Sequence, residues 1–172
     1  MGTTTPDPSS PLGRLLNAPM RPGSVTWIGL RPARREPVIP VQTAELTPEQ
    51  GLIGDHYQSR TTSNRQITLI QAEHLIAIAA CLGNGPIDPA LLRRNIVVAG
   101  INLHALKGRA FQLGSATLLA TGDCHPCSRM EEILGPGGYN AVRGHGGITA
   151  RVLQGGRVSI GDPVRRAAIL EP

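Results

Sequence analysis

The chain has 172 residues, of which 40% are hydrophobic and 17% are charged, and its formal net charge is +5. This composition predicts one globular domain and excludes a disordered chain. No apolar run reaches the roughly 18–20 residues of a membrane helix, and the N-terminus lacks the apolar core of a signal peptide. We therefore expect a cytoplasmic protein without membrane contact. Helix-turn-helix and zinc-finger spacings are absent and base-stacking aromatics are few, which argues against nucleic-acid binding.

The N-terminal third of the chain is expected to be largely extended. Residues 1–23 are rich in Thr, Pro and Ser, so they are predicted to be a disordered tail before a single domain over residues 24–172. The stretch SVTWIGLRP predicts a first strand. REPVIPVQTAELT predicts a second extended segment, whose prolines suit the edge of a sheet. Thr47, Gly51 and Gly54 then indicate a turn.

The middle of the chain carries the clearest helix signals. RQITLIQ predicts a strand, and the Ala-rich AEHLIAIAACL after it predicts a helix that ends at Gly83. DPALLRRN predicts a second, short helix with Asp88 as its N-cap and Pro89 at its first helical position. NIVVAGINL predicts a strand that bends at Gly100, and FQLGSATLLATG predicts two extended pieces around Gly114.

The C-terminal third is rich in turns. SRMEEIL predicts a short helix that GPGG ends, and GYNAVRGHGG predicts a glycine-rich loop. ITARVL and RVSI flank Gln154, Gly155 and Gly156, which predicts a β-hairpin. The total of seven or eight strands joined by short turns, with two or three helices, predicts a mainly β fold: a barrel or sandwich with mostly antiparallel strands.

The segment TGDCHPCSRM raises the question of what Cys124 and Cys127 do. A thioredoxin-like dithiol lies at the start of a long helix that follows a strand in a βαβ unit. Here the helix is cut short by GPGG, and the surrounding pattern is not βαβ. Structural zinc requires four ligands, and one CxxC pair supplies half of them. A third alternative is that the two cysteines only pack in a turn.

The residues around the cysteines are polar, which argues against simple packing. Asp123, His125 and Ser128 suggest an accessible setting, and Arg129 next to Cys127 favours the thiolate, which is the nucleophilic and metal-binding form. The N-terminal dipole of the short helix acts in the same direction. A thiolate in a basic setting could bind a soft or high-valent metal, or it could carry a transferable sulfur as a persulfide.

Five stretches in this order resemble the MOSC domain, which occurs at the C-terminus of molybdenum cofactor sulfurases and in stand-alone bacterial proteins. They are GLIGDHY, RQITLIQAEH, RRNIVVAGINLHALKGRAFQLGSATLLATG, CHPCSR and GGITARVLQGGRVSIGDPV. The resemblance implies a β-rich, barrel-like domain with a cysteine that binds the molybdenum of molybdopterin or relays sulfur. Cys127, which follows Pro126, matches that cysteine. Cys124 has no clear counterpart, so it could be a resolving thiol, a second sulfur acceptor or a bystander.

The resemblance also implies residues that hold the phosphate and the pterin. Arginine suits phosphate, and asparagine can pair with a pterin edge. Each candidate has a structural alternative: fixing a turn, bridging a helix and a strand, or carrying surface charge. His145 in RGHGG is expected on an exposed loop, with a role in a lid or in substrate contact. The cofactor-binding candidates are Arg65, Arg94, Asn95, Asp55, His56 and Arg129.

Two functional hypotheses follow from the resemblance. In the first, the protein binds a molybdenum–molybdopterin cofactor with Cys127 as metal ligand and reduces N-hydroxylated compounds. In the second, it carries sulfur as a Cys127 persulfide that Cys124 resolves or accepts. The chain has neither a pyridoxal-phosphate domain nor a ferredoxin-type cysteine cluster. We therefore expect a separate protein to donate the electrons or the sulfur.

Overall fold

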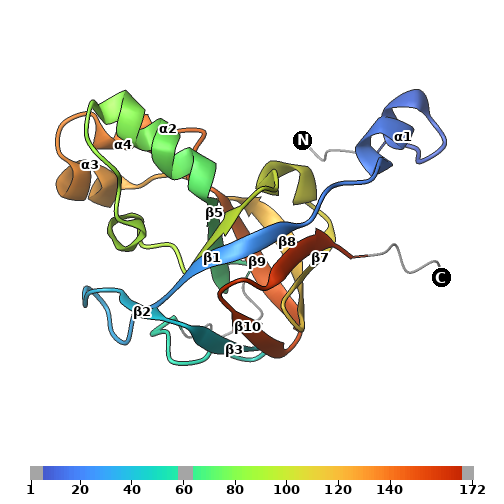
Figure 1. Cartoon of the computed structure of the whole chain (residues 1–172), viewed down its shortest axis with the longest axis horizontal. Coiled ribbons are helices and arrows are strands. Elements are labelled where there is room, and N and C mark those ends of the chain that lie inside the picture. Colours follow the sequence, from blue (N-terminus) through green and yellow to red (C-terminus); the bar gives the residue numbers. More distant parts are fainter. Residues whose placement is uncertain (1–5, 58–63, 168–172) are drawn as a thin grey trace.

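Seven strands close into a barrel in this computed structural model, which describes residues 6–57 and 64–167 (Figure 1). Around the barrel the strand order is β1-β11-β7-β8-β9-β5-β6, and it closes because β1 pairs with both β6 and β11. The strands are β1 Gly23–Leu30, β2 Ile39–Val41, β3 Thr43–Thr47, β4 Gly51–Leu52, β5 Ile67–Gln71, β6 Ile96–Ala99, β7 Ala110–Leu113, β8 Ala116–Asp123, β9 Ile148–Gln154, β10 Gly156–Ser159 and β11 Pro163–Arg166.

The predicted fold class is confirmed, because the barrel is mainly antiparallel. Within the described ranges, β5 and β6 form the one parallel pair, with Leu69 opposite Ile96. Parallel strands need a crossover connection, which the helices between them supply. Strand β2 extends the sheet beyond β1 as an edge, as the prolines of its segment predicted.

The described residues form four α-helices and two 3-10 helices, η1 and η2, of which α1 precedes the first strand. Helix α2 begins directly after β5 and ends at Gly83, whose left-handed φ of 66° gives the predicted helix stop. Asp88 caps η1 as predicted, although the helix is 3-10 and not α. The helices are α1 Pro11–Asn17, α2 Ala72–Leu82, η1 Pro89–Leu92, η2 Leu103–Leu106, α3 Ser128–Leu134 and α4 Gly138–Val142.

The barrel interior and the helical layer form two separate cores. Alternate residues of each strand fill the barrel, as with Ala116, Leu118 and Ala120 of β8. Helices α2, α3 and α4 lie together at one end of the barrel (Figure 1). They cover the outer face of β5 and β6, where Ile70 and Val97 pack with helical residues. Both faces of these two strands are therefore buried, which explains their nearly continuous hydrophobic sequence.

The predicted hairpin of residues 148–160 is wrong. Strand β9 pairs with β5 and β8. Strand β10 instead pairs with β3, in a second, three-stranded sheet with the order β10-β3-β4. The chain turns away at Gly155, where an added Cβ would lie 2.7 Å from the carbonyl oxygen of Leu46. This close backbone approach directs residues 156–159 onto β3 instead of back along β9.

Two segments expected to lack regular structure contain helices. The segment before Gly23, predicted as a disordered tail, carries α1, which Ser10 caps by accepting a hydrogen bond from Gly13 N. The helix is tied to the barrel, because Arg109 Nη1 donates to Asn17 Oδ1 at 2.7 Å. The glycine-rich stretch 138–147, predicted as a loop, likewise contains the whole of α4. None of the helices described has the length and apolarity needed to cross a bilayer.

Candidate functional site

The cysteine segment connects the end of β8 to the start of α3. Its backbone packs against the glycines that precede β9: Cys124 N donates to Gly147 O at 2.8 Å. An added Cβ on Gly146 would lie 2.1 Å from Cys124 O, and one on Gly147 would lie 1.9 Å from Leu69 O. The Gly-Gly pair of RGHGG is therefore required so that two backbones can meet beside the thiols.

The two cysteines lie in different environments. Cys124 is 3% exposed, and its Sγ lies 3.9 Å from Arg65 Nη2. Cys127 is exposed and forms the N-cap of α3. Both are free thiols in this structure. The exposed position of Cys127 is the one that a metal ligand or a sulfur carrier needs, since the thiol has to reach a molecule from outside the chain.

Arg94 is a buried cation behind the cysteine segment, with 7% of its surface exposed. Its guanidinium donates to three carbonyl oxygens, those of Gly146 at 2.8 Å, Leu92 at 2.7 Å and Cys124 at 3.3 Å. Burial lowers the pKa of Arg94. Negative charge at Cys124 and Cys127 raises this pKa, and the positive charge of Arg65 lowers it. The residue thus fixes the segment in place and puts a positive charge next to both thiols.

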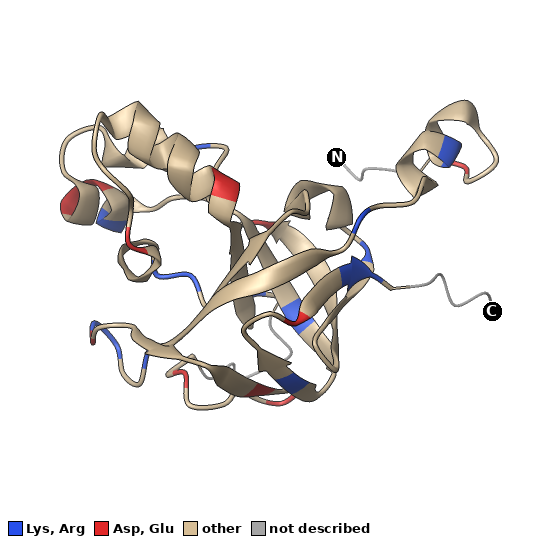
Figure 2. Cartoon of the chain, viewed as in Figure 1, with Lys and Arg blue, Asp and Glu red and all other residues tan. Residues whose placement is uncertain are grey.

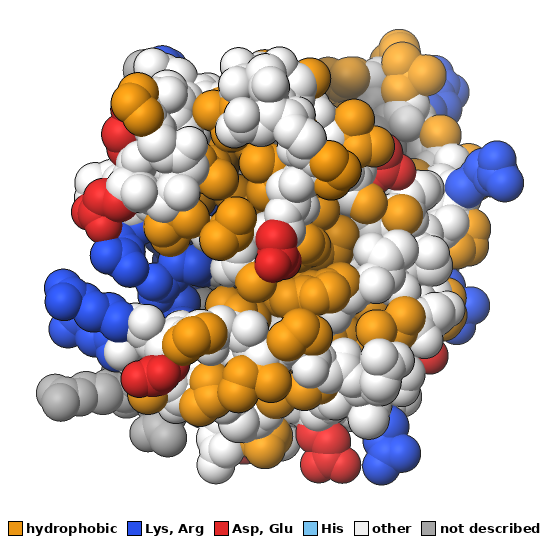
Figure 3. Space-filling view, turned by 60° about the vertical axis from the view of Figure 1, so that its left-hand side comes forward, with side chains coloured by type: hydrophobic (Ala, Val, Ile, Leu, Met, Phe, Trp, Pro, Cys, Tyr) orange, Lys and Arg blue, Asp and Glu red, His pale blue; other side chains and the backbone are white. Residues whose placement is uncertain are grey.

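Two further arginines near the site were missed in the sequence. Arg31 is half-buried, and burial together with the charge of Arg93 lowers its pKa, while Asp55 raises it. Arg93 holds a left-handed φ of 58°, which is uncommon outside glycine. The two adjacent arginines at positions 93 and 94 were the sequence feature that could have drawn attention to Arg93. Figure 3 shows basic side chains gathered at one edge of the face it displays. Others are spread over the rest of the molecule (Figure 2).

Asp55, His56 and Asn95 form a network that joins neighbouring segments of the fold. Asn95 Nδ2 donates to Asp55 Oδ2 at 2.7 Å, and Asp55 Oδ1 accepts from the backbone N of His56 at 2.9 Å. Asn95 Oδ1 accepts from Thr68 N at 3.1 Å, and Arg31 Nε donates to His56 Nδ1 at 3.2 Å. These are the hydrogen bonds that a structural role requires. Contact of these residues with a cofactor stays a prediction.

Arg129 and His145 lie differently from what the sequence suggested. Arg129 Nη1 donates to Glu132 Oε2 at 2.7 Å along α3, so its charge is directed at a carboxylate of its own helix. His145 is half-buried and not on an exposed loop, because Gly146 and Gly147 after it are buried against the cysteine segment. The ring of His145 packs edge-on against His74, with ring centroids 5.0 Å apart.

A cavity of about 310 Å³ opens beside Cys124. On its wall His104 Nδ1 lies 3.0 Å from Asp123 Oδ1, and Lys107 Nζ donates to Asp123 Oδ2 at 2.7 Å. The hydrogen bond from Lys107 lowers the pKa of Asp123, with a further lowering by His104. None of these three residues was predicted from the sequence to be a site residue. The lining residues are His104, Lys107, Asp123, Cys124, His125, Pro126, Gly144, Gly146 and Gly147.

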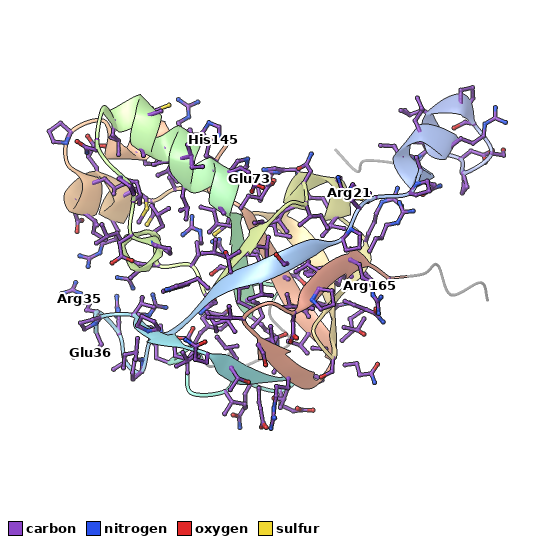
Figure 4. All side chains as sticks on the ribbon, in the orientation of Figure 1. Arg21, Arg35, Glu36, Glu73, His145 and Arg165 are labelled. Atoms are coloured by element: carbon purple, nitrogen blue, oxygen red, sulfur yellow. The ribbon has the colours of Figure 1, made fainter. Side chains whose placement is uncertain are left out.

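A row of histidines lies behind this wall. His74 lies between His145 and His104, and the ring centroids of His74 and His104 are 5.9 Å apart. Burial lowers the pKa of His74, and repulsion from His145 and His104 lowers it further, so its imidazole is neutral at pH 7. Figure 4 shows His145 and Glu73 beside α2, the helix that carries His74.

The donor set does not form a metal site by itself. Among residues 6–57 and 64–167 there is no group of three or more His, Cys, Asp and Glu side chains arranged to hold an ion. What the site offers is an exposed thiol, a buried guanidinium behind it, further arginines and a cavity with a histidine–aspartate pair.

Comparison with known proteins identifies the family. The model of the MOSC domain matches residues 54–165. The chain belongs to the MOSC domain family. The match includes both cysteines, Arg94 and the cavity residues, whereas Arg31 lies outside it. A search of curated proteins found no match.

Solved structures show the same fold. The YuaD protein from Bacillus subtilis is 20% identical and has a TM-score of 0.74, with 84% of this chain and 94% of that one covered. YiiM from Geobacillus stearothermophilus is 18% identical with a TM-score of 0.70, covering 86% and 76% of the two chains. YiiM from Escherichia coli is 19% identical with a TM-score of 0.65, covering 87% and 72%. At this identity the likeness concerns the MOSC fold alone.

Proposed function

We propose that this MOSC protein binds a molybdenum–molybdopterin cofactor, with the Cys127 thiolate as the protein ligand of the metal. In this proposal it reduces N-hydroxylated compounds with electrons from a separate protein. The observation that carries the proposal is the buried Arg94 beside two thiols. The site residues fit such a group, because they combine one accessible soft ligand with several guanidinium groups.

Arg94 supports this proposal through its buried charge. A buried cation is strongly disfavoured unless negative charge or hydrogen bonds compensate it. The three acceptors of Arg94 are neutral carbonyl oxygens, and the negative charge that would stabilise it is one on Cys124, on Cys127 or on a bound anion. A site built this way favours an anionic ligand. A cofactor that carries a phosphate and binds to a thiolate would bring negative charge from both of these groups.

The arginines near the site suit the phosphate of the pterin. Burial lowers the pKa of Arg31 and the charge of Arg93 lowers it further, so an anion near both guanidinium groups would offset their repulsion. Arg65, next to Cys124, adds a third guanidinium. When bound, the molybdenum would supply two-electron redox chemistry. The chain itself would orient the cofactor and shape the cavity for the substrate.

Cys127 fits the ligand role better than Cys124 does. Cys124 is buried, its backbone N and O are both hydrogen-bonded, and its sulfur points toward Arg65. Cys127 is exposed at the end of the same segment, and its backbone O accepts from Met130 N at 2.9 Å in the first turn of α3. The segment thus holds Cys127 firmly while leaving its thiol accessible.

The test is the molybdenum and pterin content of the protein purified from a host that makes the cofactor. We expect nearly stoichiometric metal in the wild type and in Cys81→Ala, whose thiol is exposed on α2, and loss of metal in Cys127→Ala. Wild-type protein that never acquires the metal under any loading condition would overturn the proposal. Metal retained in Cys127→Ala would move the ligand role to another residue.

The second candidate function is sulfur transfer, which the pair of free thiols two residues apart favours. Cys127 would hold the persulfide, and Cys124 would accept its outer sulfur. After incubation with a cysteine desulfurase and free cysteine, mass spectrometry of alkylated protein would show one added sulfur on Cys127. A Cys127 that stays unmodified while the desulfurase turns over would count against this function.

A further inference from the structure

On the wall of the cavity beside Cys124, His104 is paired with a carboxylate and is thereby arranged to transfer a proton. His104 lies on η2, and Asn102 fixes that helix by accepting from His104 N at 3.1 Å. The ring Nδ1 of His104 lies 3.0 Å from Asp123 Oδ1, at the end of β8. Since both residues line the cavity, the pair faces the space that a substrate next to the cysteine segment would occupy.

The pairing decides which nitrogen of His104 carries a proton. An ionised carboxylate only accepts hydrogen bonds, so Nδ1 must donate to Asp123, and Nε2 is left for exchange with a ligand. Lys107 strengthens this arrangement, because it donates to Asp123 Oδ2 at 2.7 Å and keeps the carboxylate ionised. Both carboxylate oxygens therefore have a cationic or protonated partner.

His125 also lines the cavity and is exposed, whereas His104 is the lining histidine that a carboxylate orients among the described residues. Asp123 faces His104 from β8, and His74 faces it from α2 at a centroid separation of 5.9 Å. Lys107, which directly follows η2, reaches the other oxygen of Asp123. Burial and repulsion from His145 and His104 lower the pKa of His74, while the charge of Glu73 acts in the opposite direction. The buried Nδ1 atoms of His74 and His145 have no hydrogen-bond partner among the described residues. The hydrogen bond from Lys107 lowers the pKa of Asp123 and so keeps its carboxylate ionised.

We infer that His104 is the proton donor for the reaction in this cavity, with Asp123 and Lys107 as positioning residues. This inference rests on the proposed reduction of N-hydroxylated compounds. In that reaction R–NHOH takes up two electrons and two protons and gives R–NH₂ and H₂O. The N–O bond breaks, and the Nε2 proton of the imidazolium passes to the departing oxygen, which leaves as water. A water molecule supplies the second proton to nitrogen and becomes hydroxide, which a proton from bulk solvent neutralises. A reduced flavin or iron–sulfur protein supplies the electrons.

The first measurement does not depend on activity. Nitrogen NMR of ¹⁵N-histidine-labelled protein at alkaline pH distinguishes the two neutral tautomers of each ring. We expect His104 with its proton on Nδ1 in the wild type, and a shift toward the Nε2–H form in Asp123→Asn, whose amide can present an NH₂ group to the ring. A wild-type His104 with its proton on Nε2 would overturn the inference.

The second measurement uses cofactor-loaded protein with phenylhydroxylamine as probe and dithionite-reduced methyl viologen as electron source. General acid catalysis contributes about 10²–10⁴-fold, so we expect kcat of His104→Gln to fall by at least a hundredfold at unchanged KM and molybdenum content. Added imidazole should restore part of the activity of His104→Ala. Unchanged kcat in His104→Gln would overturn the inference.

The two proposals fail in different ways. Protein with the expected tautomer that never acquires molybdenum overturns the proposed function, and the proton-donor role falls with it. If cofactor-loaded protein reduces the probe equally well with and without His104, the proposed function is retained, and the role of His104 as proton donor is overturned. A fall in kcat together with loss of metal in His104→Gln would instead assign His104 to holding the cofactor.

Discussion

Arg94 and Cys124 are linked through the backbone: the Nη2 atom of the buried guanidinium lies 3.3 Å from the Cys124 carbonyl oxygen. The same guanidinium reaches Gly146 O and Leu92 O, so one side chain ties η1, the cysteine segment and the turn before β9 together. This relationship makes the thiol geometry dependent on a residue that lies 30 positions earlier in the chain.

Arg94→Met should destabilise the protein. The variant leaves buried carbonyl oxygens without donors, and each such loss costs about 1–3 kcal/mol, so we expect the free energy of unfolding to fall by about 2–4 kcal/mol. Urea denaturation followed by circular dichroism measures this. The matched control is Arg143→Ala, an exposed arginine, which should change stability by less than about 0.5 kcal/mol. A variant as stable as the wild type would mean that Arg94 is kept for a ligand and not for the fold.

Gly146→Ala should disturb the site more than any surface glycine does. Its Cβ would lie 2.1 Å from Cys124 O, so either the turn or the cysteine segment has to move. We expect a loss of about 2–4 kcal/mol, as for a strongly overpacked core position. Gly85→Ala is the control, because nothing lies within 4 Å of its Cβ. Similar thermal midpoints for the two variants would show that the close approach is not needed for folding.

Lys107→Met should reduce the acid sensitivity of the protein. The hydrogen bond from Lys107 lowers the pKa of Asp123 below its usual 3.8. A lowered folded-state pKa contributes stability that is present above pH 4 or so and is lost as pH falls through the folded value. In the variant we expect about 0.5–1 kcal/mol less stability at pH 7, and a smaller loss between neutral pH and pH 3. Parallel pH–stability curves for the two proteins would contradict this.

Thiol labelling should separate the three cysteines. Cys81 and Cys127 are exposed and Cys124 is buried. With Ellman's reagent on the native protein we expect fast reaction at the two exposed thiols and slow reaction at Cys124, which should become fast in denaturant. Single Cys→Ala variants assign the phases. Fast labelling of Cys124 in the native state would show that the segment opens readily, and it would weaken the distinction drawn between the two site thiols.

The amino-acid sequence by itself determined the elements whose signals are local. The hydrophobic run of β5, the Ala-rich α2 with its stop at Gly83, and the Asp88 cap of η1 all appear as predicted, because periodicity and capping depend on residues a few positions apart. The order of the MOSC-like stretches also identified the family, which the family model confirms over residues 54–165. Cys127 was singled out in the same way, and its role stays a prediction.

Only the tertiary structure decided the partners of those elements. A pattern of two strands around Gly155 is compatible with a hairpin, and it is packing against β3 that sends β10 to another sheet. His104 meets Asp123 across 19 positions, and Arg94 meets Cys124 across 30. Such contacts depend on how the whole barrel closes and on which side chains its helices bury, and no short window of sequence contains that information.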